Sequence, residues 1–253
     1  MTANPFDANS GLQAYPVWDR TVRWFHWINV VCVLGLLTVG TFIYYGDHFG
    51  VSDEGKILLK TIHVSVGYVF LTNLVWRLVW AFIGGPFARW GRLLPFRRGY
   101  GLAYREYVSG FRQGDPPPYA GHNPAARLSV TLLLALMISQ ASTGLVLAGT
   151  DLYFPPFGKS IAEWVAADGQ DASGLLAGSK EGVDAQAWDE MRAFRSPIIT
   201  VHKWGYYLLL LLIPLHVLGV IFTDIRERSG LVSAMFTGRK VFHRRPVDLN
   251  DDA

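Results

Sequence analysis

Four long runs of apolar residues constrain the fold of this chain more than any other feature of its sequence. They cover residues 28–45, 57–83, 128–149 and 198–223. Each run has roughly the 20 residues with which an α-helix crosses about 30 Å of hydrocarbon. Runs this long are rare in soluble cores, although a soluble bundle of very apolar helices is the alternative. The sequence therefore predicts an all-α membrane protein, a bundle of four transmembrane helices.

The composition excludes several classes of protein. The chain is 51% hydrophobic and only 17% charged, which excludes a disordered protein. Its net charge is only +3 and the basic residues form no single stripe, so a nucleic-acid partner is not expected. Cys32 is the single cysteine, which excludes an internal disulfide, a c-type haem attachment motif and a cluster bound by four thiolates. Any cofactor must have other ligands.

Arginine and lysine predict how the spans are oriented, because cytoplasmic loops are enriched in both. Residues 84–127 contain seven arginines, and the residues after Thr223 contain six basic side chains. Residues 150–197 carry eight acidic side chains against four basic ones. An even number of spans places both termini on one side. We therefore expect cytoplasmic N and C termini and a long periplasmic loop between the third and fourth helices, in a multi-pass protein of a bacterial inner membrane.

The spans divide the chain into one membrane domain with two tails. We expect a flexible tail over residues 1–17, a four-helix domain over 18–243 and a C-terminal tail over 244–253. Aromatic residues in the loop 150–197 predict that it folds on the protein surface or on a partner, since loops of this length tend to be functional. Aromatic residues at helical spacing in 102–111 predict a short helix on the inner membrane face.

Four of the seven histidines lie in the spans or at their ends, where ionisable residues are costly and usually functional. His26 is near the inner end of the first span, and His63 is near the outer end of the second. His202 and His216 are both in the fourth span, 14 residues apart. That spacing corresponds to about 21 Å along a helix and leaves both side chains within about 40° of one face. The spans therefore predict an outer pair, His63 with His202, and an inner pair, His26 with His216.

Paired imidazoles at two depths suit two haems. A haem iron takes axial ligands on opposite faces of its ring, and neutral imidazole is a common ligand. Zinc usually takes four ligands, and no cysteine or carboxylate is near either pair in the sequence. Four unrelated interfacial histidines are the alternative. We expect two b-type haems, with iron bound by His63 and His202 outside and by His26 and His216 inside, so that residues 18–243 form a dihaem cytochrome b domain.

Other residues in the spans are candidates to contact haem. Arg77 lies 14 residues after His63, and therefore on the same helix face near the inner haem. It is a candidate to neutralise a propionate, and the alternative is an arginine that extends to the membrane surface. Lys60 and Lys203 are weaker candidates outside. Glycines would admit a flat macrocycle or allow close helix packing: Gly35, Gly40, Gly67 and Gly144. The other histidines are interpreted as solvated: His48, His122 and His243.

Several motifs resemble those of a known family. The motifs are Trp18-Asp19-Arg20 with Val22-Arg23-Trp24-Phe25-His26-Trp27, His63 with Asn73-Leu74-Val75-Trp76-Arg77, Val201-His202-Lys203-Trp204 with His216, and Ser233-Ala234-Met235-Phe236-Thr237-Gly238. Together they resemble the b-type cytochrome subunits of membrane-bound nickel–iron hydrogenases, in the bacterial cytochrome b561 superfamily, to which the gamma subunit of formate dehydrogenase is related. The likeness covers about residues 15–243.

The resemblance implies a dihaem cytochrome that passes electrons between a periplasmic redox partner and membrane quinone. The partner would be hydrogenase-like subunits or, because the outer loop is longer than usual, another oxidoreductase. The resemblance also implies that Asn123 binds quinone, although Ala125 stands where the formate dehydrogenase relative has glycine. We expect the electron-transfer subunit of an oxidoreductase complex, with no catalytic side chain of its own.

Two other functions stay open at this point. A stand-alone superoxide oxidase or quinone reductase of the same superfamily would need a positive pocket beside the outer haem, for which the candidates are Lys60, Lys203, Arg192 and Arg195. The purified protein would then reduce quinone with superoxide. A non-redox membrane anchor would bind no haem.

Overall fold

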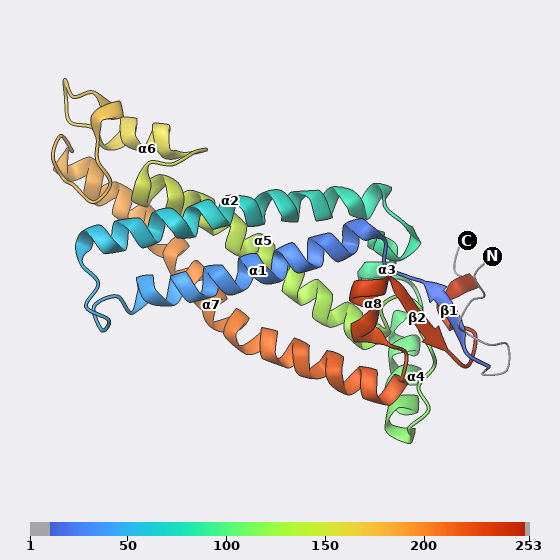
Figure 1. The fold of residues 1–253 in the computed structure, drawn as a ribbon. Coiled ribbons are helices and arrows are strands. Elements are labelled where there is room, and N and C mark those ends of the chain that lie inside the picture. The colour runs from blue at the N-terminus through green and yellow to red at the C-terminus, as the bar shows by residue number, and fades with distance from the viewer. Residues whose placement is uncertain (1–10, 251–253) are drawn as a thin grey trace, which may run out of the picture. The chain divides into compact units, whose positions relative to one another are not determined.

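The computed structural model describes residues 11–250 of the chain. Four of its helices are long and apolar enough to cross a membrane (Figure 1): α1 (Arg20–Tyr44), α2 (Asp53–Ile83), α5 (Pro124–Leu152) and α7 (Ala185–Glu227). Large apolar side chains stay exposed along them, for example Val31 at 71% and Phe82 at 72%, as expected where lipid is the surrounding solvent. The four predicted spans are confirmed as helices, and each helix begins several residues earlier than predicted.

Capping residues explain these earlier starts. In each long helix, the side-chain oxygen of the residue before the first turn accepts a hydrogen bond from the backbone N–H three residues later. Such caps satisfy donors that have no partner inside the helix. The four pairs are Asp19 with Val22 at 2.8 Å, Ser52 with Gly55 at 3.1 Å, Asn123 with Ala126 at 2.8 Å and Asp184 with Ala187 at 2.8 Å.

The remaining elements are short. They are β1 (Gln13–Pro16), η1 (Pro86–Ala88), α3 (Trp90–Leu93), α4 (Tyr100–Gln113), α6 (Gly158–Val165), η2 (Ala172–Gly174), α8 (Leu231–Thr237), β2 (Arg239–Phe242) and η3 (Val247–Asn250). The chain forms two compact units. Unit 1 holds the described residues up to Trp27, Trp76–Leu134 and the described residues from Leu212, and unit 2 holds Ile28–Val75 and Ala135–Leu211. Each long helix contributes one part to each unit, and each unit contains one of the two histidine pairs.

In unit 1 the two ends of the described chain pair with each other. Strand β1 pairs antiparallel with β2, in the register Gln13↔Phe242. The expected flexible tail over residues 1–17 is thus wrong for Gln13–Pro16, whereas residues 1–10 lie outside the described residues. A small core supports the sheet: Val17, Trp18, Ala120 and Ala234. Helix α4 confirms the helix predicted over 102–111 and ends at Gly114, whose φ of 84° favours glycine.

Two buried charged residues hold the loop that leads into α5. Lys240 Nζ donates hydrogen bonds to the carbonyl oxygens of Tyr119, at 3.2 Å, and Gly121, at 2.9 Å. The carboxylate of Asp248 accepts from the backbone N–H groups of Ala120, at 2.7 Å, and Gly121, at 2.8 Å. Both side chains are almost fully buried, and burial lowers the pKa of Lys240 to about 8. The C-terminal residues therefore fix the backbone of this loop.

Unit 2 contains the expected long loop, which folds on itself. Helix α5 runs to Leu152 and α7 begins at Ala185, so only residues 153–184 lie outside the two long helices. Within this segment α6 packs through Ile161 and Val165 against Met191 of α7. Gly205 lets α7 approach α5 closely, since a side chain there would run into Gln140. The prediction that the loop folds on the protein surface is confirmed for these residues.

Candidate functional site

His63 and His202 form a pair inside unit 2. His63 is carried by α2 and His202 by α7, and their ring centroids are 6.3 Å apart with the ring planes 72° apart. Metal–imidazole bonds are about 2 Å long, so two imidazoles that bind one ion from opposite sides have ring centres about 6 Å apart. The separation of these two rings therefore fits two axial ligands of one iron.

The backbone and side chains around His202 orient its ring. The hydroxyl of Thr143 donates to the Ser139 carbonyl at 2.7 Å and lies 2.9 Å from Nδ1 of His202. A hydroxyl that donates to the Ser139 carbonyl is able to accept the Nδ1 proton, and in that tautomer the lone pair of Nε2 is free to bind a metal. A partner at the far nitrogen is usual for metal-binding histidines, because it fixes the tautomer and raises ligand basicity. Nδ1 of His63 is buried and lacks a hydrogen bond of normal geometry within residues 11–250.

Both rings line a pocket with a volume of about 450 Å³, which lies in the range of about 300–1,000 Å³ typical of ligand sites. Three of the glycines predicted to admit a macrocycle line it: Gly40, Gly67 and Gly144. A Cβ at Gly40 would lie 3.4 Å from His63, and one at Gly144 would lie 3.6 Å from His202, whereas a Cβ at Gly67 meets no atom within 4 Å. Gly35 does not line the pocket. The space beside the histidines therefore depends on missing side chains, as a flat ring requires.

His26 and His216, the predicted second pair, both lie in unit 1. His26 is carried by α1 and His216 by α7. Nδ1 of His26 is buried and has no hydrogen-bond partner within the described chain. Among residues 11–250 no three His, Cys, Asp or Glu side chains gather as a metal site. Each site thus offers two imidazoles, which suits a haem and falls short of the usual zinc set.

Arg77 also belongs to unit 1 and is only 6% exposed. The alternative of a side chain that extends to the membrane surface is therefore wrong. Its Nη2 donates to the Ala88 carbonyl at 3.2 Å, and its guanidinium lies over the Phe25 ring at 5.9 Å. Nη1 is buried and unpartnered in the part of the chain that the structure describes. A buried cation with a free donor fits the predicted contact with a carboxylate, which stays a prediction.

The side chain of Asn123 is held by hydrogen bonds to three neighbouring groups. Its Oδ1 caps α5, and its Nδ2 donates to the Tyr107 hydroxyl at 2.7 Å and to Glu227 at 3.2 Å. Tyr107 in turn donates to Glu227 at 2.7 Å. An asparagine side chain has two donors and two acceptor sites, and three of these four are used. The predicted contact between Asn123 and quinone stays a prediction.

The interpretation of His122 as a solvated histidine is wrong. Its ring packs on Trp18, with centroids 4.7 Å apart, and its Nδ1 is buried without a partner in the described residues. The ring is covered because the contacts made by Lys240 and Asp248 hold its loop against the core of unit 1. His48 and His243 are exposed, as expected.

His122 makes the stability of unit 1 depend on pH. Burial, followed by the positive charges of Lys240, Arg77 and Arg127, lowers the pKa of His122 from 6.5 to about 3. Between these values the unfolded chain binds a proton that the folded chain does not, so stability falls as the pH falls from 6.5 towards 3. We expect the thermal unfolding temperature in detergent to fall less on acidification in His122→Phe than in the parent chain. His243→Phe is the control, and equal acid profiles for His122→Phe and the parent would contradict this role.

Two residues around the His63–His202 pocket were not predicted as site residues. They are Thr143 and Asp151, of which Asp151 lines the pocket together with Arg195, a residue named above for a positive outer pocket. Helical spacing would have placed the last two at the pocket, because Asp151 lies seven residues after Gly144 and Arg195 lies seven before His202. Seven residues are about two helical turns and return to the same face. Lys60 lies three residues before His63, about one helical turn away, so helical spacing also places it near the pocket.

Known proteins match this chain over a range that includes both histidine pairs. Residues 17–238 match the family described as prokaryotic cytochrome b561. A probable Ni/Fe-hydrogenase B-type cytochrome subunit of Rhizobium leguminosarum bv. viciae is 26% identical, over 92% of this chain and 91% of the relative. The subunit of the same description in Cupriavidus necator is 24% identical over 93% and 90%. A probable Ni/Fe-hydrogenase 1 B-type cytochrome subunit of Escherichia coli K12 is 26% identical over 88% of both chains.

Proposed function

Because the chain belongs to the prokaryotic cytochrome b561 family, we propose that it is a dihaem b-type cytochrome, which passes electrons across a bacterial inner membrane between a periplasmic redox partner and quinone. The observation that carries this proposal is the His63–His202 pair, whose rings are 6.3 Å apart and line one pocket. A second pair in the same chain, His26 with His216, supports a second haem. Haem at each pair would supply one-electron redox chemistry.

The residues of each site have separate tasks in this proposal. His63 and His202 hold one iron, and His26 and His216 hold the other. Thr143 keeps the His202 ring in the tautomer that binds metal, and Gly40, Gly67 and Gly144 leave room for the ring. Most of the other lining side chains are apolar, and the polarity around a haem is one of the means by which proteins set its reduction potential.

The proposed partners follow from the relatives and from charge. The relatives are described as hydrogenase subunits, and we propose hydrogenase-like subunits as the electron donor of this chain. The acidic segment 150–197 would face the periplasm with the His63–His202 site, since the arginine-rich segments favour the cytoplasm. Quinone would be reduced beside the His26–His216 site, where Arg77 offers a buried free donor and Asn123 holds the start of α5.

A haem count on the purified protein, with a reduced-minus-oxidised spectrum, tests the proposal. We expect about two low-spin b haems per chain, one for each histidine pair. A single haem would mean that one pair is structural. A protein that binds none, after expression with ample haem, would contradict the redox function and favour a membrane anchor.

A further inference from the structure

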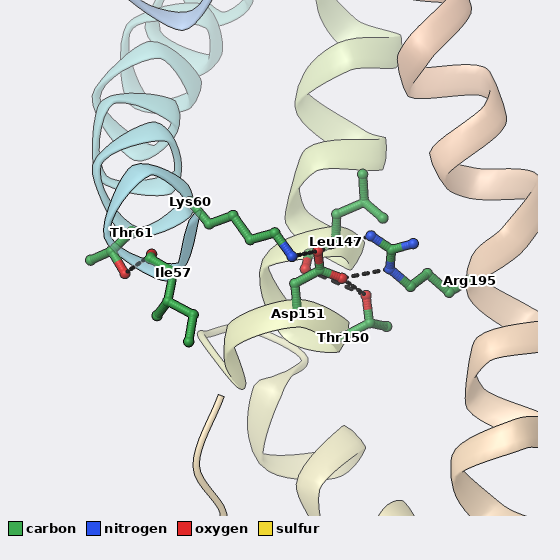
Figure 2. A network of polar contacts seen from close by, with 7 residues as sticks. All are labelled: Ile57, Lys60, Thr61, Leu147, Thr150, Asp151 and Arg195. Atoms are coloured by element: carbon green, nitrogen blue, oxygen red, sulfur yellow. Dashed lines mark hydrogen bonds and ion pairs between the residues drawn. The ribbon is translucent and has the colours of Figure 1, made fainter. Parts of the chain in front are cut away.

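A cluster of three charged side chains joins three helices of unit 2. Lys60 of α2 and Arg195 of α7 approach Asp151 of α5 from opposite sides, as Figure 2 shows. Lys60 Nζ lies 2.9 Å from Asp151 Oδ2, and Arg195 makes two bonds to the same carboxylate, from Nε to Oδ1 at 2.5 Å and from Nη2 to Oδ2 at 2.8 Å. The side chain of Asp151 is only 14% exposed. The side chains of Arg195 and Lys60 are 20% and 36% exposed, so the ion network is partly buried and its carboxylate is the most buried member.

This cluster belongs to the His63–His202 pocket. All three residues line that pocket together with the two histidines. Lys60 precedes His63 by three residues of one helix, and Arg195 precedes His202 by seven of another. The charges therefore lie about one and two helical turns from the imidazoles.

The pocket contains more positive than negative charge. Lys60, Arg195 and Lys203 line it with three cations, and Asp151 is the one carboxylate among the lining residues. The excess of two positive charges equals the charge of the two propionates of a b-type haem, so that bound haem would neutralise the pocket.

Lys60 and Arg195 also have hydrogen-bond donors that Asp151 does not use, and these donors are available to a second carboxylate. Lysine has three donors and arginine five, and in the described chain Asp151 engages one donor of Lys60 and two of Arg195. Lys203 makes no ion pair within residues 11–250 and lies over the Tyr44 ring at 4.8 Å. Propionates could thus bind without displacing Asp151.

We propose, on the basis of the function proposed above, that Lys60, Arg195 and Lys203 bind the propionates of the haem held by His63 and His202, and that Asp151 positions the first two cations. Asp151 is a positioning residue, because it acts through Lys60 and Arg195. Its negative charge also favours the oxidised, more positive iron, so it lowers the reduction potential of this haem. An ion network that lay away from the bound haem would have no such effect on the potential.

A redox titration of Asp151→Asn in the full-length holoprotein tests this inference. The amide keeps an oxygen for Arg195 and removes the charge. We expect both haems to be retained, the midpoint potential of the His63–His202 haem to rise and that of the other haem to stay unchanged. Glu163→Gln is the matched control, because Glu163 is an exposed acid of α6, in the same unit, whose nearest ion-pair partner is the exposed Lys159 at 3.8 Å. Two retained haems with unchanged potentials in Asp151→Asn would overturn the inference.

If the Asp151→Asn variant does not accumulate as folded protein, a second variant tests the same inference. Lys203→Met removes an exposed cation that no ion pair holds in the described chain, so the fold should tolerate it. We expect the potential of the same haem to fall, and Lys159→Met to leave it unchanged. An unchanged potential in Lys203→Met would overturn the inference. Failure of the parent chain to bind haem would instead contradict the proposed function, so the two failures are distinguishable.

Discussion

Replacing His202 by alanine is expected to remove one haem and leave the other. The pocket of unit 2 would lose one of its two imidazoles, and a single axial ligand does not hold a low-spin haem of this kind. Alanine is a strong helix former, and the Thr143 hydroxyl would keep its bond to the Ser139 carbonyl. The helix should therefore persist. Haem content should fall from about two per chain to about one.

The measurement is a haem-to-protein ratio with a redox titration, which also identifies the potential of the haem that is lost. His48→Ala is the matched control, since His48 is exposed and should leave both haems bound. Retention of both haems in His202→Ala would show that the pairing of histidines is wrong. Loss of both would show that the two sites do not form independently.

The histidine pairs could be predicted from sequence because they depend on helical spacing. His202 and His216 share one face of a helix whatever surrounds it, and the number of spans fixes which partner lies at each level. The structure places His63 with His202 in unit 2 and His26 with His216 in unit 1, which is consistent with this pairing. The family suggested by the same motifs is confirmed by the match over residues 17–238.

The helix boundaries cannot be predicted from hydropathy alone, because capping residues decide where each helix begins. Hydropathy alone predicts the start of the fourth span at residue 198, whereas α7 begins at Ala185 because Asp184 caps it. The capping side chains Asp19, Ser52, Asn123 and Asp184 are all visible in the sequence, and using them would have corrected each start. The role of Asn123 as the cap of α5 is also visible in the sequence, because Pro124 follows it and proline is favoured at the first helical position.

The burial of His122 and the tail could not be predicted from local patterns. Lys240, Asp248 and strand β1 are far from residue 122 in the sequence, and only tertiary contacts bring them together. Nothing near Lys240 in the sequence marks it as buried, because a lysine in a basic tail is normally solvated. Long-range contacts of this kind decide which polar residues surround a site, whereas spacing along a helix decides its ligands.

Replacing Gly67 by phenylalanine is expected to remove the same haem as His202→Ala without touching a ligand. Gly67 lines the pocket, and no atom lies within 4 Å of a Cβ built there. A large side chain would therefore occupy the space beside the histidines and leave neighbouring helices in place. Replacing a glycine in a helix interior by phenylalanine also favours the helix, by about 0.3–0.5 kcal/mol. We expect a folded protein that retains about one haem per chain, that of the other pair.

Gly35→Phe is the matched control for this substitution. Gly35 is also a helical glycine with no atom within 4 Å of a Cβ, but it does not line the pocket. Haem content and thermal stability of the two variants should be compared in the same detergent. Loss of one haem in Gly67→Phe alone would show that the pocket receives the macrocycle. Equal haem content in the two variants would mean that the space beside Gly67 is filled by lipid or by packing, and the macrocycle would then have to lie on another face of the His63–His202 pair.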